Sequence, residues 1–124
     1  MNTILITGCS TGFGLYTAKT FIDRGWSVIA TMRNPKAGIL PASAHLLALD
    51  VTDADSIANA VAKAGPFDVL VNNAGIGMLG AMEGVTMARI REVFETNTFG
   101  TMAMIQAVLP QMRARQSGVV INVT

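Results

Sequence analysis

The sequence is poor in charged residues and in cysteine. Charged side chains make up 14% of its 124 residues, against roughly 25% in an average soluble domain. A chain with so little charge is expected to bury a sheet on both faces, or to have surfaces that other parts cover. Cys9 is the only cysteine, which excludes an internal disulfide and fits a reducing compartment. The net charge of +1, without a basic cluster, argues against nucleic acid or a membrane surface as a partner.

The sequence also lacks a membrane span, a secretory signal and a metal-binding motif. The longest uncharged stretch, residues 96–112, contains Gly100, Gln106 and Pro110 and is a poor candidate for a transmembrane helix. A strand-like apolar run and a glycine-rich loop follow Met1 directly, unlike the order in a secretory signal. His45 is the only histidine and has no metal-ligand spacing around it. We therefore expect a cytoplasmic location, no membrane partner and no metal.

Strand-like and helix-like segments alternate along the chain. Apolar runs that predict strands occupy residues 2–7, 26–31, 45–50, 67–72 and 118–124. Helical spacing of apolar residues runs from about Phe13 to Gly25, from a cap at Thr52 to Gly65, and from Met87 to about Arg115. After the second strand, Pro and Gly break the connection from Asn34 to Pro41. Continuous apolar strands are typical of a parallel sheet that is covered on both faces. The order, read as β-α-β-α-β-α-β-α-β, predicts one α/β domain with a doubly wound parallel sheet, the Rossmann fold.

Residues 7–14, TGCSTGFG, form a glycine-rich loop directly behind the first predicted strand. Gly8, Gly12 and Gly14 have neither the spacing of the common dinucleotide fingerprint nor that of a P-loop. Ligands of a doubly wound sheet bind beyond the carboxyl ends of the strands, and a helix N-terminus at that place attracts phosphate. The loop is therefore either a pyrophosphate cradle or an ordinary turn between a strand and a helix, and its spacing alone does not decide.

The residues after the second predicted strand bear on which dinucleotide the loop would hold. Folds that prefer NAD usually place an acidic residue about 20 residues past the loop, where it binds the ribose 2′-hydroxyl. No acidic residue occurs from Arg24 to Leu49, and Arg33 lies just past the strand. A guanidinium forms charge-assisted bonds to a 2′-phosphate, so we hypothesise NADP(H) in preference to NAD(H). The alternative is that Arg33 is a solvated loop cation.

Four motifs stand at the predicted strand ends and in the long predicted helix. They are Thr7-Gly8-x-x-x-Gly12-x-Gly14, Asp50-Val51, Asn72-Asn73-Ala74-Gly75 and Asn97-x-x-Gly100. Together they resemble the short-chain dehydrogenase/reductase family, in the family's order and over residues 2–124. The resemblance implies the strand order 3-2-1-4-5, cut after the fifth strand, and one incomplete NAD(P)-binding domain over residues 1–124.

The resemblance also implies which residues contact the cofactor. The pyrophosphate would be held by the glycine-rich loop, through Gly8, Ser10, Thr11, Gly12, Phe13 and Gly14. Asp50 and Val51 would border the adenine. The Asn-Asn-Ala-Gly stretch would steady the sheet and line the adenosine ribose, through Asn73, Ala74 and Gly75. A basic residue at Arg33 matches the subgroup of the family that uses NADP(H).

Asn97 lies on the apolar seam of the long predicted helix, whose members are Ile90, Phe94, Thr101, Met104, Val108 and Met112. We expect Asn97 to be buried, and because an unpaired buried amide costs about 1–3 kcal/mol, we also expect it to have hydrogen-bond partners. It is either a structural amide at a helix bend or the Asn of the family's catalytic tetrad. The resemblance implies the second role, in which Asn97 holds a water of the proton relay.

The family's catalytic Ser and its Tyr-x-x-x-Lys motif have no counterpart in residues 1–124. Tyr16, the only tyrosine, precedes Lys19 with the wrong spacing. The resemblance implies an NADP(H)-dependent oxidoreductase that transfers hydride between nicotinamide and an alcohol or carbonyl substrate, with residues 1–124 inactive alone. The alternative is a nucleotide-binding sensor or interaction module without catalysis.

Partners are expected from two further features. Met78, Leu79 and Met82 follow the Asn-Asn-Ala-Gly turn and suggest an apolar small-molecule substrate. The last predicted strand would present an apolar edge, so residues 1–124 made alone are expected to aggregate or form a non-native oligomer. The resemblance implies a homo-oligomer for the native protein.

Overall fold

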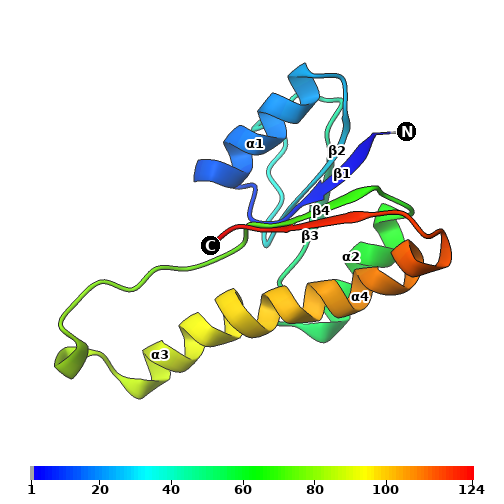
Figure 1. Cartoon of the computed structure of the whole chain (residues 1–124). Coiled ribbons are helices and arrows are strands. Elements are labelled where there is room, and N and C mark those ends of the chain that lie inside the picture. The colour runs from blue at the N-terminus through cyan, green and yellow to red at the C-terminus, as the bar shows by residue number, and fades with distance from the viewer. Residues whose placement is uncertain (1) are drawn as a thin grey trace.

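The structure, a computed structural model, describes residues 2–124 and contains one sheet of five parallel strands (Figure 1). The strands are β1 (Thr3–Ile6), β2 (Ser27–Met32), β3 (His45–Ala48), β4 (Val69–Asn72) and β5 (Val119–Asn122). Their order across the sheet is β3-β2-β1-β4-β5, and every neighbouring pair is parallel. The predicted α/β class and the strand order 3-2-1-4-5 are confirmed.

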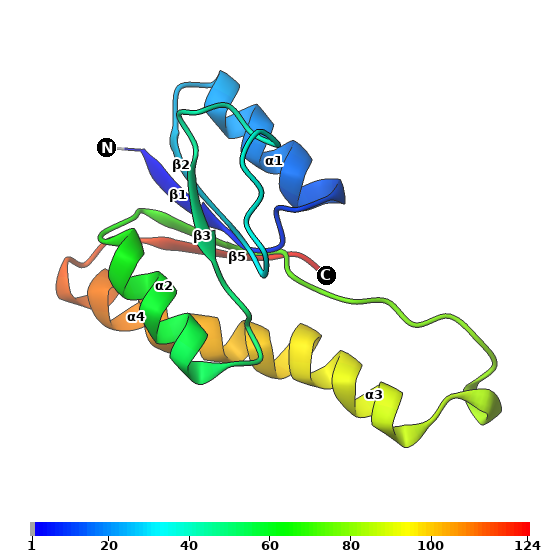
Figure 2. The same ribbon diagram turned by 180° about the vertical axis from the view of Figure 1, so that it is seen from behind.

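Helices cover both faces of the sheet. α1 (Gly12–Asp23) lies on one face, and α2 (Ala54–Ala64) and α4 (Gly100–Ala114) lie on the other (Figures 1 and 2). Successive residues of β1 point into these two layers: Ile6 belongs to the core with Ala18 of α1, whereas Leu5 belongs to the core with Met104 of α4. The sheet is therefore doubly wound. No helix in residues 2–124 has the length and apolarity needed to cross a membrane.

The connection between β2 and β3 differs from the predicted alternation. Residues 33–44 contain turns and bends but no helix, so the predicted broken connection is confirmed, and the helix that the β-α-β order placed between the second and third strands is wrong. Pro35 and Pro41 interrupt this connection, and each lacks the N–H that a helix needs. Gly38 adopts a φ of 91°, outside helical geometry. Leu40 is nevertheless buried in the core on the α1 side.

The cap of α2 is Asp53, and the predicted cap at Thr52 is wrong. The Asp53 carboxylate accepts hydrogen bonds from the main-chain N–H groups of Asp55 at 2.9 Å and Ser56 at 3.3 Å. The Thr52 hydroxyl instead donates to the Asp50 carboxylate at 2.7 Å. Both residue types are good N-caps, so the choice depended on the path of the chain out of β3.

The long predicted helix is divided in the structure. A short helix, η1 (Met82–Gly84), precedes α3 (Met87–Phe94), and a π-helical segment, η2 (Glu95–Phe99), joins α3 to α4. Met104, Val108 and Met112 are buried as predicted, but Phe94 is 54% exposed and Asn97 is also exposed. The expected burial of Asn97 is therefore wrong. The physical reason is visible in Figure 1, where α3 extends beyond the layers that pack on the sheet.

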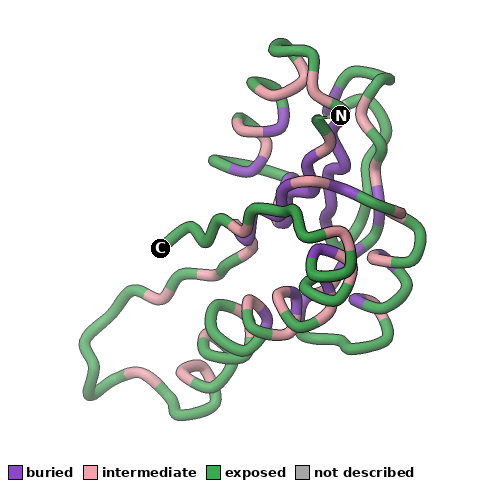
Figure 3. Tube along the Cα trace, turned by 45° about the vertical axis from the view of Figure 1, so that its right-hand side comes forward, coloured by how far each residue is buried: buried purple, intermediate pink, exposed green. Residues whose placement is uncertain are grey.

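β5 is an edge strand, and its residues are exposed except for the half-buried Val120 (Figure 3). Within the described chain its only neighbour in the sheet is β4. Val119 is 53% exposed and Ile121 is 44% exposed, whereas β4, one strand further in, is buried along its whole length. The apolar edge expected from the sequence is present.

Candidate functional site

A cavity of about 730 Å³ opens at the carboxyl ends of β1, β2, β3 and β4. Its walls are the glycine-rich loop, the residues that follow each strand, and the helical segments α3 and η2. It brings together most of the predicted cofactor residues, namely Gly8, Ser10, Thr11, Gly12, Phe13, Arg33, Asp50, Val51, Asn73, Ala74 and Gly75. Gly14 and Asn97 do not line it.

Sequence reasoning missed several residues of this wall. Glu92, Glu95 and Thr96 reach the cavity from α3 and η2. No local signal identifies them, because their position depends on where α3 and η2 lie relative to the sheet. Ile76 also lines the cavity, and its place directly after the Asn-Asn-Ala-Gly motif was a signal that could have found it.

The glycine-rich loop has a conformation that other residues would not readily adopt. Gly8 and Gly12 have φ angles of 72° and 59°, in the left-handed region that favours glycine. A Cβ at Gly14 would lie 2.1 Å from the Gly8 carbonyl oxygen, so Gly14 allows α1 to pack closely on the loop. Thr11 is the N-cap of α1 and makes no side-chain cap. The first N–H groups of α1 are thus available to an anion.

Thr7 joins the glycine-rich loop to the end of β4. Its hydroxyl oxygen accepts hydrogen bonds from the N–H groups of Asn73 at 3.0 Å and Ala74 at 2.8 Å. In return, the Asn73 side-chain amide donates to the carbonyls of Thr7 at 3.2 Å and Gly8 at 3.3 Å. These four bonds fix two walls of the cavity relative to each other, a role for Thr7 that its motif position alone did not reveal.

Arg33 and Asp50 are charged residues at the strand ends of the cavity, which Glu92 and Glu95 also line. The Thr52 hydroxyl and the Thr52 N–H, at 2.7 and 2.9 Å, stabilise the Asp50 carboxylate and lower its pKa below its ordinary value, with a smaller contribution from the charge of Arg33. Arg33 is exposed and makes no hydrogen bond within residues 2–124. Its guanidinium donors are therefore available to a ligand.

Cys9 lies in the same loop but is not a candidate nucleophile. Its side chain is fully buried, and its thiol donates to the Ile6 carbonyl at 3.2 Å. Burial raises the pKa of the Cys9 thiol to about 12, so the reactive thiolate is scarce near neutral pH. Among the described residues, no group of three or more His, Cys, Asp or Glu side chains is placed to hold a metal ion.

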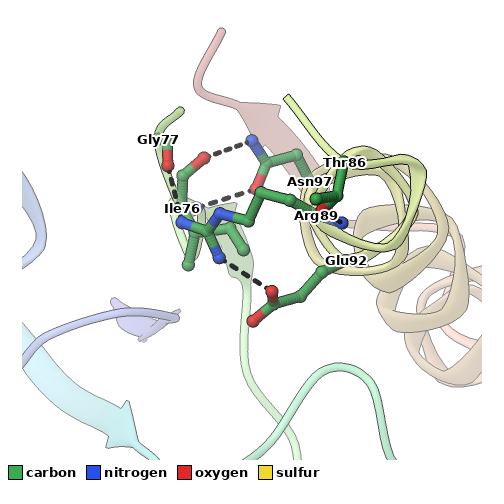
Figure 4. Close-up of polar contacts among 6 residues, drawn as sticks. All are labelled: Ile76, Gly77, Thr86, Arg89, Glu92 and Asn97. Atoms are coloured by element: carbon green, nitrogen blue, oxygen red, sulfur yellow. Dashed lines mark hydrogen bonds and ion pairs between the residues drawn. The ribbon is translucent and has the colours of Figure 1, made fainter. Parts of the chain in front are cut away.

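Asn97 has the hydrogen-bond partners that its sequence position led us to expect, although it is exposed. Its Oδ1 accepts from the Ile76 N–H at 2.8 Å, and its Nδ2 donates to the Ile76 carbonyl at 2.8 Å (Figure 4). A Cβ at Gly75 would lie 3.2 Å from the Asn97 Oδ1, so a glycine there favours this close approach. Through these two bonds, Asn97 joins the η2 segment to the extended backbone that follows β4.

A doubly wound sheet of order 3-2-1-4-5, with a glycine-rich loop and a helix N-terminus at a cavity beyond its strand ends, has the architecture of dinucleotide-binding domains. The comparison with known families is more specific. The family model described as short chain dehydrogenase matches residues 2–124, and the chain belongs to this family.

Relatives and solved structures agree with this assignment. The chain is 38% identical to retinol dehydrogenase 8 of Bos taurus and 41% identical to 3-ketodihydrosphingosine reductase of Bacteroides thetaiotaomicron, covering 98% of this chain in both alignments. It spans 44% and 46% of those two proteins, about half their length. The structure of ElxO with NADP bound superposes with a TM-score of 0.91 at 26% identity, over 99% of this chain and 55% of ElxO.

Proposed function

We propose that this chain binds NADP(H) in the 730 Å³ cavity and forms the cofactor-binding part of an oxidoreductase. The observation that carries the proposal is the convergence of the glycine-rich loop, Arg33, Asp50 and the segment after β4 on one cavity. Gly12 lines the cavity and has no other atom within 4 Å of its Cβ position, which fits a close approach of the backbone to a pyrophosphate, while Gly8 and Gly14 allow the loop to pack on the end of β4 and on α1. The bound nicotinamide would supply or accept the hydride of an alcohol–carbonyl interconversion.

Arg33 is proposed to select the phosphate-bearing cofactor. Its guanidinium is exposed at the cavity, and the acidic residue that usually binds the ribose 2′-hydroxyl is missing between Arg24 and Leu49. A relative of this fold, ElxO, has been solved with NADP, which supports the same choice. Asp50 would remain ionised beside the adenine, with its charge satisfied by Thr52.

Calorimetric titration with NADPH and with NADH tests the preference. The protein that contains this chain should bind NADPH more tightly, and Arg33→Ala should weaken NADPH binding by roughly 10-fold or more, in keeping with a charge-assisted bond. Lys36→Ala is the matched control, since Lys36 is also an exposed cation of the same connection but does not line the cavity. Equal affinity for both cofactors that persists in Arg33→Ala would refute the preference.

Asn97 is proposed to act in the proton relay of the family. Each polar atom of its side chain makes one bond to Ile76 and keeps a second hydrogen-bonding site, so a relay water has both the side chain and the main-chain carbonyl of Asn97 as partners. That carbonyl already accepts the Thr101 hydroxyl at 2.9 Å, and a carbonyl oxygen has a second lone pair for a water.

Tyr16 is 75% exposed on α1 and does not line the cavity. The Ser, Tyr and Lys of the reaction are therefore proposed to lie outside residues 1–124, which alone would be inactive.

The substrate is proposed to be an apolar small-molecule alcohol or ketone. Residues 78–82, named here the 78–82 loop, follow the cavity wall and carry the exposed side chains of Leu79 and Met82. The names of the two relatives refer to retinol and to 3-ketodihydrosphingosine, molecules with long hydrocarbon portions. Oxidation of retinol with NADP⁺, followed by absorbance of NADPH, tests this class, with a short polar alcohol such as glycerol as the control.

The native protein is proposed to be a cytoplasmic homo-oligomer. The outer surface near the start of α4 carries apolar side chains that no described residue covers, including Phe99 and Met102, at 53% and 52% exposed. Light scattering of the purified protein measures the oligomeric state, and a monomer at micromolar concentration would contradict the proposal.

A further inference from the structure

Arg89 joins α3 to the segment that follows β4 (Figure 4). Its Nη2 donates a hydrogen bond to the Gly77 carbonyl at 2.9 Å, and its Nη1 forms an ion pair with Glu92 at 2.8 Å. Its main-chain N–H donates to the Thr86 hydroxyl at 3.1 Å, in the N-cap of α3. The guanidinium is thus held between a carbonyl of the segment and a carboxylate of its own helix.

The Gly77 carbonyl is the last point at which this segment is hydrogen-bonded to α3 or η2 before the 78–82 loop. Asn97 holds the preceding residue, Ile76. Beyond Gly77, the hydrogen bonds of residues 78–85 that the described chain provides are local, from Gly84 N–H to the Ala81 carbonyl and from Val85 N–H to the Met82 carbonyl. Arg89 therefore determines where the free part of the loop begins.

The sequence of the loop makes it sensitive to that anchor. Gly77 has open space around the position of a Cβ, and Gly80 has a φ of 146°, which other residues rarely adopt. Glycines on either side of Met78 and Leu79 leave the backbone with many accessible conformations. The direction of the loop is thus set by its attachment points more than by its own residues.

Glu92 connects the same anchor to the cofactor cavity. Glu92 and Ile76 line the 730 Å³ cavity, whereas Arg89, Met78 and Leu79 line a second cavity of about 360 Å³. The Arg89–Glu92 ion pair lies between the two. An exposed ion pair contributes little to the stability of the fold. The effect of this one is to orient the Arg89 guanidinium toward the Gly77 carbonyl.

We propose that Arg89 is a positioning residue, which holds the 78–82 loop so that Met78 and Leu79 form an apolar wall for the substrate next to the cofactor cavity. The inference rests on the proposed function, because it treats the loop as part of a substrate site. Arg89 itself does not line the cofactor cavity and contacts it only through Glu92.

Methyl NMR of the methionines in the protein that contains this chain tests the positioning. Arg89→Ala should shift and broaden the signals of Met78 and Met82, whereas Met104 and Met112, buried in the core, serve as internal references. Arg91→Ala is the matched control, since Arg91 is exposed on the same helix and its side chain makes no hydrogen bond or ion pair with the described residues. Arg89→Lys keeps a donor for the Gly77 carbonyl and should restore part of the change.

Steady-state kinetics with retinol and NADP⁺ tests the consequence for the substrate. Loss of one hydrogen bond corresponds to about a fivefold rise in KM for Arg89→Ala, and kcat should change less than about twofold because no reacting group is altered. Methionine signals identical to those of Arg91→Ala, or a fall in kcat with KM unchanged, would overturn the proposal. No retinol oxidation by the unsubstituted protein would count against the proposed substrate class, and the methyl spectra would still decide whether Arg89 holds the loop.

Discussion

Replacing Gly14 by alanine should destabilise the fold, although it lies within a helix. A Cβ at this position would lie 2.1 Å from the Gly8 carbonyl oxygen and 2.6 Å from the Asn73 Nδ2. Neither atom is free to move. The Gly8 oxygen belongs to the main chain, and the Asn73 side-chain amide donates hydrogen bonds to the carbonyls of Thr7 and Gly8. The clash can be relieved only by moving α1 away from the glycine-rich loop.

Two opposing free-energy terms decide the sign of this change. Alanine is more stable than glycine in a helix interior by about 0.5–1 kcal/mol. Overpacking typically costs about 1–3 kcal/mol, and a contact with main chain at 2.1 Å belongs at the upper end of that range. We therefore expect the free energy of unfolding to fall by about 2 kcal/mol in Gly14→Ala.

Urea denaturation followed by circular dichroism measures this change, and NADPH titration of the same variant should show weaker binding because the first turn of α1 is displaced. Gly84→Ala is the matched control: its Cβ would meet open space and its φ lies outside the left-handed region. A Gly14→Ala variant as stable as the unsubstituted protein, or more stable, would refute the packing argument.

Four further outcomes are expected. Thr7→Val, which keeps the shape but removes the acceptor of two N–H groups, should lower the unfolding free energy by about 1–3 kcal/mol in urea titrations. Asp53→Ala should cost about 1 kcal/mol as a lost N-cap, more than Thr52→Ala. The lowered pKa of Asp50 adds stability that is complete above the ordinary value of 3.8 and is lost as pH falls through the folded-state value below it, so denaturation curves of the unsubstituted protein and Asp50→Asn should converge in acid. Residues 1–124 made alone should self-associate through β5, and Ile121→Lys should reduce the particle size measured by light scattering.

The fold could be predicted from the sequence because its signals are local and repeated. Each apolar run forms a strand, as Ile4 to Ile6 does in the buried β1, and the alternation with helical segments restricts the topology to a few possibilities. The cap of α2 could not be assigned with the same certainty, since Thr52 and Asp53 are adjacent and both suit an N-cap. The choice between them goes with a local turn, in which the Asp50 carboxylate accepts from the N–H and hydroxyl of Thr52 and leaves Asp53 to cap the helix.

The residues of the cofactor cavity that follow strand ends could be predicted from the sequence. Those that α3 and η2 contribute could not. Gly8, Arg33 and Asp50 lie directly after strands, so the parallel sheet alone brings them together. Asn97 was placed in the buried seam because apolar residues recur around it at helical spacing, but the π-helical segment 95–99 and the projection of α3 leave it exposed. Its partner, the backbone of Ile76, has no side-chain signature in the sequence.

The segment from Asn73 to Gly77 is held from two sides, and this arrangement links the cofactor cavity to the 78–82 loop. Thr7 binds its first residues to the glycine-rich loop, and Asn97 and Arg89 bind its last residues to η2 and α3. A ligand that orders the glycine-rich loop therefore stabilises one end of a segment whose other end directs the 78–82 loop. Since such coupling between binding equilibria is reciprocal, an apolar substrate that orders the 78–82 loop should tighten cofactor binding to the same extent.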